Sequence, residues 1–474
     1  MNLIEKAFVG GEWIETAEES IKVLNPATEE IIGSVPNLGA SEAQIAISAA
    51  KDALSLWKSL DAFDRSKFLR KIYELIIERV DDYAKVLTLE NGKSLSEARG
   101  EIIYGAGYFE LYSEECKRIN GEILTSPKAS KIELTREPIG VVGLITPWNF
   151  PQAMLARKLS AALAAGCTVV AKPDHQTPFS ALLLGKICED AGLPKGVVNI
   201  LTGQPEPIAK QMMDSSVVKK VSFTGSTRVG KILISQSAAT VKKLSLELGG
   251  NAAFIVFDDA DLDKAVEGAM ASKYRNSGQT CVCTNRFFVH RSIAKEFVSR
   301  FKEKVFQLKI GNGLVENVKV GPMINKLATD KMEQLIEEIR KVPNTIIHTT
   351  DINEDRGFFY PPTLVVSESK NHRLFKEEIF GPISAIYEFD SEEDVIELAN
   401  ETEYGLASYF YTKDASRIER VTKALDYGMI GVNSGRVSHP YAPFGGVKES
   451  GFGREGGKLG ILEYTNVKMR YQLV

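Results

Sequence analysis

The chain has 474 residues, of which 44% are hydrophobic and 25% are charged, and its formal net charge is −4. This length predicts roughly two or three domains, and the composition is typical of a soluble globular protein with a large core. No apolar run approaches the ~20 residues of a membrane span, and there is no long basic block, so we expect neither a membrane nor a nucleic acid as a partner.

The beginning of the chain and its cysteines indicate a cytoplasmic protein. The first residues, MNLIEKAFVGGEW, lack the basic start and apolar core of a secretory signal. The cysteines are odd in number and mostly lie singly, which is typical of free thiols in a reducing compartment. Cys281 and Cys283 are too close for a Cys-x-x-Cys knuckle, and no two histidines have a His-x-x-x-His spacing, so no metal site is predicted.

The first third of the chain is predicted to be a short β lead-in followed by helices. Residues 7–35 contain a Gly-Gly turn and an Asn-Pro turn between apolar runs, which indicates short strands. Residues 41–117 are predicted to be mostly helical. Within them, the segment RSKFLRKIYELIIERV has apolar residues at steps of three and four.

From residue 139 strands and helices alternate, which predicts a parallel sheet with helices on both faces. The strands are IGVVGLITP, CTVVAKP, VVNILTG, KKVSFTGS and KKLSLELGG, and helical segments such as MLARKLSAALAAG lie between them. Because ligands of such sheets bind beyond the carboxyl ends of the strands, the tails TPWN, KPDHQTP, FTGST and ELGG are the candidate site.

A second alternating region, residues 249–443, predicts another α/β domain. Residues 119–139 and the tail LEYTNVKMRYQL have β character but belong to neither series. They are predicted to form a small projecting sheet, as an oligomerisation element would.

Two glycine-rich segments match nucleotide-binding patterns only superficially. GFGREG, residues 451–456, follows a polar loop instead of a strand, so it is predicted to be a flexible loop. GSTRVGKI, residues 225–232, nearly matches a Walker A loop but ends in Ile232 where a hydroxyl is needed for magnesium. Its helix start could receive a phosphate, or Ser226 or Thr227 could simply cap the helix; the residues alone leave both open.

Several ordered motifs resemble the aldehyde dehydrogenase superfamily over nearly the whole chain. They are TPWNFP, AALAAGCTVVAKP, FTGS, LELGGNAAFIVFDDADLDKA, GQTCVC, EEIFGP and PFGGVKESGFGRE. The segment GQTCVCTNR is most similar to the succinate-semialdehyde dehydrogenase branch. The resemblance implies an α/β fold with a Rossmann-like NAD(P)-binding domain (residues 1–118 and 140–248), a catalytic domain (residues 249–443) and an oligomerisation element (residues 119–139 and 455–474). It also implies homodimers or homotetramers.

The resemblance identifies three candidate catalytic residues. Cys281 matches the nucleophile, since a thiolate attacks carbonyl carbon readily when a helix start or nearby donors lower its pKa. Asn149, with the backbone N–H of Cys281, matches the oxyanion donors. Glu247 matches the base that activates the water for thioester hydrolysis, which predicts a free acid as product. Without the resemblance, these would be a buried small residue, a turn residue and a paired carboxylate.

The same resemblance implies the coenzyme contacts. Lys172 is expected at the adenosine ribose, Gly225 and Ser226 at the pyrophosphate, Glu378 at the nicotinamide ribose and Phe380 against the nicotinamide ring. The groove is expected to be lined by Ile145, Thr146, Pro147 and Trp148.

The residue at position 175 favours NADP over NAD. Relatives that prefer NAD often carry a glutamate there, which repels a 2′-phosphate, whereas this chain has His175. An imidazole removes that repulsion and can assist a phosphate together with Lys172, although Asp174 opposes this. We therefore expect NADP to be preferred, with NAD also used.

For the substrate, Arg157, Arg286 and Ser438 match the residues with which succinate-semialdehyde relatives hold the far carboxylate. The resemblance thus implies oxidation of succinic semialdehyde to succinate. The segment GRVSHPY differs from the usual apolar stretch of that branch, and Arg436 adds a charge there, so glyceraldehyde, lactaldehyde or another polar aldehyde is the alternative substrate.

Three further alternatives remain. One is a non-catalytic structural protein on the same fold, against which the joint presence of the catalytic and coenzyme-binding residues argues: Cys281, Glu247, Asn149, Lys172 and Glu378. Another is a cysteine hydrolase, for which His290 is the only histidine near Cys281 in the sequence. The third concerns Cys283, which either forms a regulatory disulfide with Cys281 under oxidation or is a small packing residue.

Overall fold

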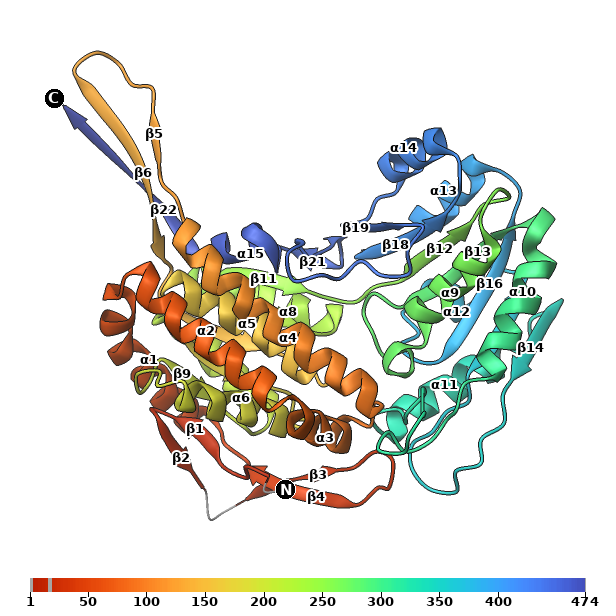
Figure 1. The fold of residues 1–474 in the computed structure, drawn as a ribbon, viewed down its shortest axis with the longest axis horizontal. Coiled ribbons are helices and arrows are strands. Elements are labelled where there is room, and N and C mark those ends of the chain that lie inside the picture. The colour runs from red at the N-terminus through yellow and green to blue at the C-terminus, as the bar shows by residue number, and fades with distance from the viewer. Residues whose placement is uncertain (1–2, 16–18, 474) are drawn as a thin grey trace.

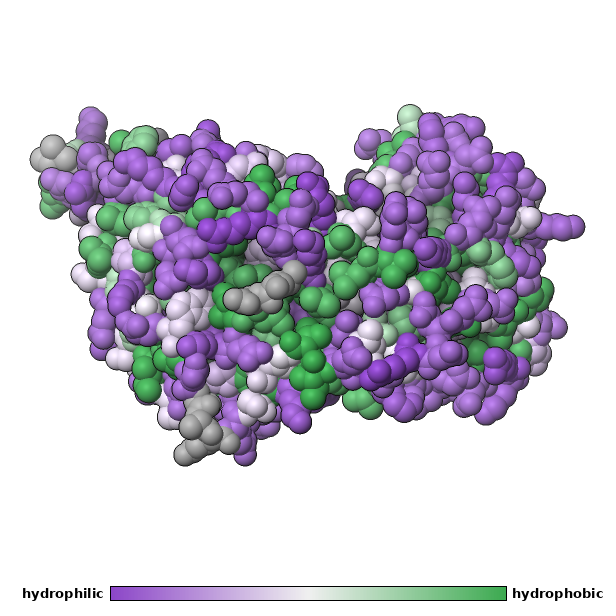
Figure 2. Space-filling view, turned by 60° about the horizontal axis from the view of Figure 1, so that its bottom comes forward, coloured by the Kyte–Doolittle hydropathy of each residue, from purple (hydrophilic) through white to green (hydrophobic). Residues whose placement is uncertain are grey.

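The computed structural model of the protein describes residues 3–15 and 19–473. Residues 1–2 and 16–18 of the predicted NAD(P)-binding domain and residue 474 of the predicted oligomerisation element lie outside the described residues. Two large sheets, each carrying helices, form two halves of the molecule, and a narrow three-stranded sheet projects from one of them (Figure 1). Figure 2 shows one face as predominantly hydrophilic, with a notch between the two halves. No helix within the described ranges is long and apolar enough to span a bilayer.

The first sheet has the predicted parallel strands at its centre. Its order is β2 (Glu12–Ile14), β1 (Ala7–Val9), β9 (Val198–Ile200), β8 (Thr168–Lys172), β7 (Val141–Ile145), β10 (Val218–Thr224), β11 (Lys243–Glu247) and β21 (Gly451–Phe452). The strands from β9 to β11 are parallel; β1 and β21 run antiparallel to them at the two sides, and β2 pairs antiparallel with β1 at the outer edge. After β7 the chain moves to one side through β8 and β9 and returns to form β10 on the other side. The order therefore reverses between β7 and β10, where such sheets bind ligands.

Helices cover both faces of this sheet. One face packs against α5 (Pro151–Ala165) and α6 (Phe179–Asp190), which are covered in turn by α2 (Ala62–Glu78), α3 (Val80–Asn91) and α4 (Leu95–Glu115). The other face packs against α1 (Ala40–Ser59), α7 (Pro205–Asp214) and α8 (Thr227–Ser237). The helix α5 is buried along its whole length, which explains its alanine-rich sequence: small side chains allow neighbouring helices and strands to approach closely.

The second sheet is also mainly parallel. Its order is β14 (Thr345–Thr349), β15 (Thr363–Ser367), β16 (Ile383–Phe389), β13 (Thr284–His290), β12 (Ala252–Val256), β18 (Ala407–Tyr411) and β19 (Met429–Val432). Its helices are α9 (Leu262–Lys273), α10 (Arg291–Phe306), α11 (Lys326–Ile339), α12 (Arg373–Lys376), α13 (Glu392–Asn400) and α14 (Ala415–Ala424). The two large sheets confirm the predicted α/β class with two parallel-strand halves.

The projecting sheet consists of β22 (Thr465–Leu473), β6 (Ser130–Pro138) and β5 (Glu122–Leu124), and β22 follows α15 (Gly457–Leu462). The strand β22 pairs with β6 along its whole length and extends with it away from the body (Figure 1). Smaller pairs are β3 (Ser20–Leu24) with β4 (Ile31–Pro36), and β17 (Tyr404–Gly405) with β20 (Val447–Lys448). The fold thus contains a projecting sheet, formed by β5, β6 and β22, while α15 lies between Glu455 and that sheet; the bounds of an oligomerisation element at residues 119–139 and 455–474 stay a prediction.

The prediction for the segment GFGREG is wrong. Residues 451–456 were predicted to form a flexible loop, but Gly451 and Phe452 form β21 and pair with Glu247 and Leu246 of β11. Gly451 has a φ of +108°, and a Cβ there would lie 2.0 Å from the carbonyl oxygen of Leu246. The glycines of this segment therefore permit a close approach to the sheet instead of mobility.

Candidate active site

The tails of β7 and β10 form a groove of about 310 Å³ at the point where the strand order reverses. Its lining includes predicted coenzyme and catalytic residues from both halves of the molecule: Pro147, Trp148, Asn149, Gly225, Ser226, Glu378, Phe380 and Cys281. The remaining predicted coenzyme residues are not in this lining but lie at or just after the ends of β7 and β8: Ile145, Thr146, Lys172 and His175. Ile145 pairs with Lys172 across β7 and β8, so the four extend the same edge of the sheet.

The groove has features that fit a phosphate-bearing coenzyme. Ser226 caps α8, its Oγ accepting the N–H of Val229 at 3.4 Å, so the free N–H groups of the helix start face the groove end. A Cβ at Gly225 would lie 2.4 Å from the ring of Phe223, so only glycine leaves the tail of β10 open here. The hydroxyls of Thr146 and Thr224 are buried without a hydrogen-bond partner in the described chain.

Lys172 and His175 differ in their surroundings. Lys172 is buried, burial lowers its pKa to about 8, and its Nζ donates to the carbonyl of Pro173 at 2.6 Å. His175 is partly exposed, with Nδ1 3.6 Å from Oδ1 of Asp174. That same oxygen of Asp174 accepts the N–H of Gln176 at 2.9 Å, which turns the carboxylate toward its own loop.

Glu378 and Phe380 come from the second half and lie opposite the β7 tail. Glu378 accepts the N–H of Gly250 at 2.9 Å, and burial raises its pKa to about 7. Phe380 has a φ of +58° and packs edge-on against Trp148, with ring centroids 5.5 Å apart. A non-glycine residue held in this backbone region is typical of a ligand-contacting position.

A second cavity, of about 680 Å³, approaches from the opposite side of Cys281. Among the residues that the structure describes, Cys281 alone lines both this cavity and the groove. The cavity is also lined by Phe150, Met154, Tyr274 and Phe444, and by charged residues that include Arg157, Arg275 and Arg436. A molecule in the groove and another in the cavity would therefore meet at the Cys281 thiol.

The loop before Cys281 has an unusual backbone that the tertiary structure enforces. Asn276 and Ser277 have φ values of 50° and 56°, and Gly278 has a φ of 77°. A Cβ at Gly278 would lie 2.3 Å from the carbonyl of Gly381, and a Cβ at Gly250 would lie 2.3 Å from the carbonyl of Cys281. The glycines of the motifs GQTC and LGGN thus let two segments close around the nucleophile.

The Cys281 thiol is protonated near neutral pH. Burial, followed by the charge of Glu378, raises its pKa to about 12, although Arg157 and Arg275 act in the opposite direction. The expectation that nearby donors lower the pKa of this thiol is therefore wrong, because burial outweighs the effect of the two arginines. Attack on a carbonyl carbon requires a group that removes the proton.

Asn149 is fixed by contacts that the sequence did not reveal. Its Nδ2 donates to the carbonyl of Gln279 at 3.0 Å, which uses one of its two N–H groups and leaves the other available. The backbone carbonyl of Asn149 accepts hydrogen bonds from Nζ of Lys93 at 2.7 Å and from Nδ2 of Asn276 at 2.9 Å. Lys93 forms a fully buried ion pair with Glu101 at 2.5 Å.

Glu101 also joins Asn149 to the following helix. Its Oε1 accepts the N–H groups of Gln152 and Ala153 in the first turn of α5, at 3.1 and 3.2 Å. The pair Lys93–Glu101 therefore holds both the carbonyl of Asn149 and the beginning of α5. The motif NGKS around Lys93 is the signal that could have indicated this role.

Glu247 lies at the end of β11, buried, and its Oε2 has no hydrogen-bond partner in the described chain. Burial and the nearby charge of Glu455 raise its pKa well above the ordinary value. Glu455 behaves oppositely: burial alone would raise its pKa, but the charges of Arg157 and Lys158 outweigh it and lower the value. The Nε of Arg157 lies 2.5 Å from Glu455, and Lys158 contacts the same carboxylate. Glu455, carried by the segment that was predicted to be flexible, was missed from sequence.

Two of the three predicted substrate residues, Arg157 and Ser438, line the cavity beside Cys281. Arg286 does not, and the prediction that it binds substrate is wrong. Its guanidinium is fully buried and donates to the carbonyls of Leu398 and Ala399 at 2.9 and 2.8 Å, in the last turn of α13. It satisfies free carbonyls at a helix end, which is a structural role.

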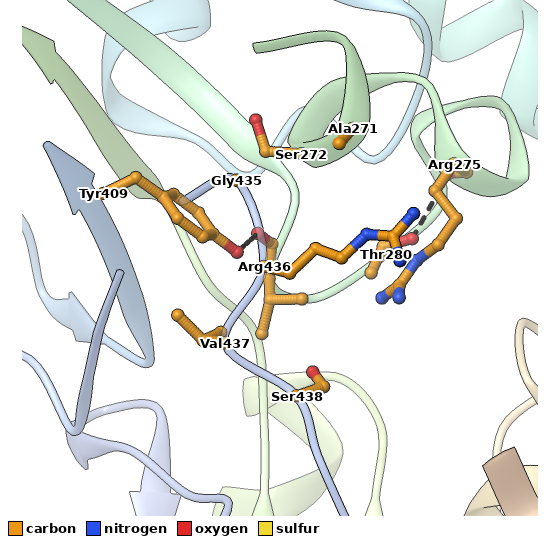
Figure 3. Close-up of a pocket in the computed structure, with 10 residues that line it drawn as sticks. Ala271, Ser272, Arg275, Thr280, Tyr409, Gly435, Arg436, Val437 and Ser438 are labelled. Carbon is orange, nitrogen blue, oxygen red and sulfur yellow. Dashed lines mark hydrogen bonds between the residues drawn. The ribbon is translucent and has the colours of Figure 1, made fainter. Parts of the chain in front are cut away.

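The structure places Arg275 where Arg286 was expected. Arg275 lies with Arg436 and Ser438 in the lining of the cavity (Figure 3), which Cys281 also lines. Its guanidinium lies 5.1 Å from the ring centre of Phe150. The sequence feature that could have indicated this role is the position of Arg275, six residues before Cys281. The segment between them has positive φ values at residues 276–278 and turns back to the cavity.

Cys283 is buried, and its thiol donates to the carbonyl of Lys273 at 3.3 Å. Both Cys281 and Cys283 are free thiols here. The packing role and the regulatory disulfide therefore both stay open. Within residues 3–15 and 19–473, no group of three or more His, Cys, Asp or Glu side chains is arranged to hold a metal ion.

Comparison with known proteins gives a family that agrees with this geometry. Residues 13–470 match the model of the "Aldehyde dehydrogenase family". The glutarate-semialdehyde dehydrogenase of Pseudomonas aeruginosa is 48% identical over 98% of this chain and 96% of its own length. The NADP(+) succinate-semialdehyde dehydrogenase of Escherichia coli is 48% identical over 98% of this chain and 97% of its own. The crystal structure of succinate-semialdehyde dehydrogenase from Burkholderia pseudomallei superposes with a TM-score of 0.98 at 48% identity, covering 100% of this chain and 98% of that one.

Proposed function

Since the chain belongs to the aldehyde dehydrogenase family, we propose that it oxidises an acidic aldehyde, succinic semialdehyde, to the free acid with NADP. The observation that carries this proposal is the position of Cys281, which lies between a groove with phosphate-binding features and a cavity lined by Arg157, Arg275 and Arg436. This arrangement brings a coenzyme and an aldehyde to the two sides of one thiol.

In the proposed reaction the Cys281 sulfur bonds to the aldehyde carbon. Because its pKa is about 12, its proton must leave during attack, and Glu247 is the group we assign to receive it. The free N–H of Asn149 and the backbone N–H of Cys281 stabilise the oxyanion that forms, each contributing roughly 3 kcal/mol. A bound nicotinamide supplies the hydride acceptor that converts the adduct to a thioester.

Hydrolysis of the thioester requires an activated water, and Glu247 is again the base once it has released the thiol proton to solvent. Its raised pKa, caused by burial and Glu455, makes it a stronger base than an ordinary carboxylate. The charges of Arg157 and Lys158 keep Glu455 ionised, so that the negative field on Glu247 persists. The product released is the free acid.

The cations of the cavity support an acidic substrate. Arg275 and Arg157 line it together with the hydroxyl of Ser438, and arginine forks bind carboxylates with two parallel hydrogen bonds. The relatives from Pseudomonas aeruginosa and Escherichia coli carry names for semialdehydes that end in a carboxylate. Both observations favour a carboxylate at the far end of the aldehyde.

The preference for NADP rests on His175. No carboxylate occupies this position, and Asp174 is already hydrogen-bonded to Gln176, so a 2′-phosphate near Lys172 would meet little repulsion. The relative from Escherichia coli is named for NADP(+). We expect NAD to be used as well, with lower kcat/KM.

We further propose that the protein is a homodimer or homotetramer assembled through the projecting sheet. Val467, Met469, Tyr471 and Leu473 alternate along β22 and are all exposed, which is unusual for apolar side chains on one strand face. The edge of β22 opposite β6 has unpaired backbone groups, so a second copy can extend the sheet. The five free thiols fit a reducing compartment such as the cytoplasm.

The test is the formation of reduced coenzyme with succinic semialdehyde and with butanal, each with NADP and with NAD. We expect kcat/KM to be higher for the acidic aldehyde and for NADP. In Arg275→Gln, kcat/KM should fall on the order of 100-fold for succinic semialdehyde and little for butanal. His175→Glu should reverse the coenzyme preference. Equal losses on both aldehydes would contradict the proposed substrate, and preference for NAD in the unaltered enzyme would contradict the proposed coenzyme.

A further inference from the structure

Two arginines of the cavity, Arg275 and Arg436, have no carboxylate within salt-bridge distance among the described residues. Arg275 and Arg436 line the same narrow recess, and Figure 3 shows their guanidinium groups converging on it. Neither forms an ion pair with a carboxylate within the described residues, whereas Arg157 in the same cavity is paired with Glu455. Like charges repel, and they are held together in a folded protein when an anion completes the site.

The backbone positions both side chains at this recess. The loop of Arg436 approaches α9 so closely that a Cβ at Gly435 would lie 2.1 Å from the carbonyl of Gly268. The N–H of Arg436 donates to the Oγ of Ser434 at 3.1 Å, and that hydroxyl donates back to the carbonyl of Arg436 at 3.0 Å. Arg275 is held by the left-handed loop and by the ring of Phe150.

The other charged groups around the cavity do not neutralise this pair. Glu101 is paired with Lys93. Glu97 is buried and its Oε1 accepts the N–H of Asn276; burial raises its pKa, while the charges of Lys93 and Arg275 lower it, so this single carboxyl is shared between two cations. Glu267 is exposed, and the exposed Lys319 adds a further positive charge to the lining. The distal end of the cavity is therefore cationic, with a neutral donor in Ser438.

We propose that Arg436 is a specificity-determining residue that forms a clamp with Arg275 for the far group of the aldehyde. The clamp accepts a doubly charged tetrahedral oxyanion, such as a phosphonate, as well as a single carboxylate. A carboxylate balances one of the two charges, whereas a phosphonate balances both and offers three acceptor oxygens to two planar forks and the Ser438 hydroxyl. This inference rests on the proposed function, since it assumes that the aldehyde end of the substrate lies at Cys281.

The experiment compares three aldehydes of similar length in the full enzyme: succinic semialdehyde, phosphonopropanal and butanal. It is run at about pH 9, because the second pKa of an alkylphosphonate lies above the ~6 of a phosphate ester and two charges are needed. We expect the unaltered enzyme to use phosphonopropanal at least as well as succinic semialdehyde. In Arg436→Gln, kcat/KM should fall on the order of 100-fold for the phosphonate and about 10-fold for the carboxylate, with butanal unchanged.

Two further variants separate the clamp from general effects. Arg436→Lys keeps the charge but loses the fork, so it should recover only part of the phosphonate activity. Arg300 is an exposed arginine of α10 that is paired with Asp263 and Glu296, and Arg300→Gln should change none of the three rates. Inhibition by propylphosphonate, measured against succinic semialdehyde, should weaken in Arg436→Gln in parallel with the phosphonate rate.

The outcomes are distinct. If Arg436→Gln lowers all three rates equally, or leaves the ratio of phosphonate to carboxylate unchanged, the clamp is overturned while the proposed function stands. If the unaltered enzyme prefers butanal to both acids, the proposed function itself fails.

Discussion

Replacing Lys93 by methionine should damage both stability and catalysis, because Lys93 and Glu101 form a buried ion pair that supports Asn149. The Nζ of Lys93 lies 2.5 Å from Glu101, 2.7 Å from the carbonyl of Asn149 and 3.9 Å from the ring centre of Phe150. Both charged side chains are 0% exposed. Lys93→Met leaves the carboxylate of Glu101 buried without its counter-charge.

Breaking a buried pair on one side costs about 3–5 kcal/mol of unfolding free energy. We expect the lower end, about 3 kcal/mol, because the two N–H groups of α5 still stabilise the carboxylate of Glu101. The carbonyl of Asn149 would keep only its bond to Asn276, so the oxyanion donor should lose part of its alignment. The largest decrease in kcat that we expect is the one caused by complete loss of this oxyanion donor, which is roughly 100-fold.

The stability change is measured by urea unfolding at one protein concentration, and the catalytic change by steady-state kinetics with succinic semialdehyde. In the double variant Lys93→Met/Glu101→Gln no unpaired charge remains buried, so it should be more stable than Lys93→Met alone. Lys67→Met, which removes an exposed lysine paired with Asp64, is the matched control and should leave the urea midpoint essentially unchanged. A loss below about 1 kcal/mol in Lys93→Met, or a double variant less stable than the single one, would refute the reasoning.

Three further outcomes are expected. Cys281→Ala should abolish formation of reduced coenzyme while leaving coenzyme binding measurable by calorimetry; turnover at the unaltered rate would disprove its role as nucleophile. Burial raises the pKa of Glu378 to about 7, so the stability it contributes is complete below its ordinary pKa of 4.5 and is lost as pH rises through about 7. The stability of Glu378→Gln relative to the unaltered protein should therefore increase over that interval, and a pH-independent difference would contradict the shift. Met469→Glu on β22 should give smaller species in light scattering; an unchanged molar mass would exclude that face from the assembly.

The sequence alone determined the features that depend on local patterns. The alternation of short β-branched strands with helices of a dozen residues predicted the parallel sheets, since period and length specify each element. The strand tails TPWN and FTGST were located for the same reason, because ligand sites follow the ends of such strands. Ordered motifs also identified Cys281, Asn149 and Glu378, which the structure brings together at one groove.

Only the tertiary structure decided which charged residues reach the cavity. Arg286 and Arg275 are both near Cys281 in sequence, yet strand pairing directs Arg286 to the carbonyls of α13, while the left-handed loop returns Arg275 to the cavity. Glu455 and Lys93 come from segments far from the nucleophile, so no local pattern could connect them to it. The protonation of Cys281 also could not be predicted from local sequence. Its pKa depends on burial and on charges from distant segments, and these come close to the thiol only when the chain folds.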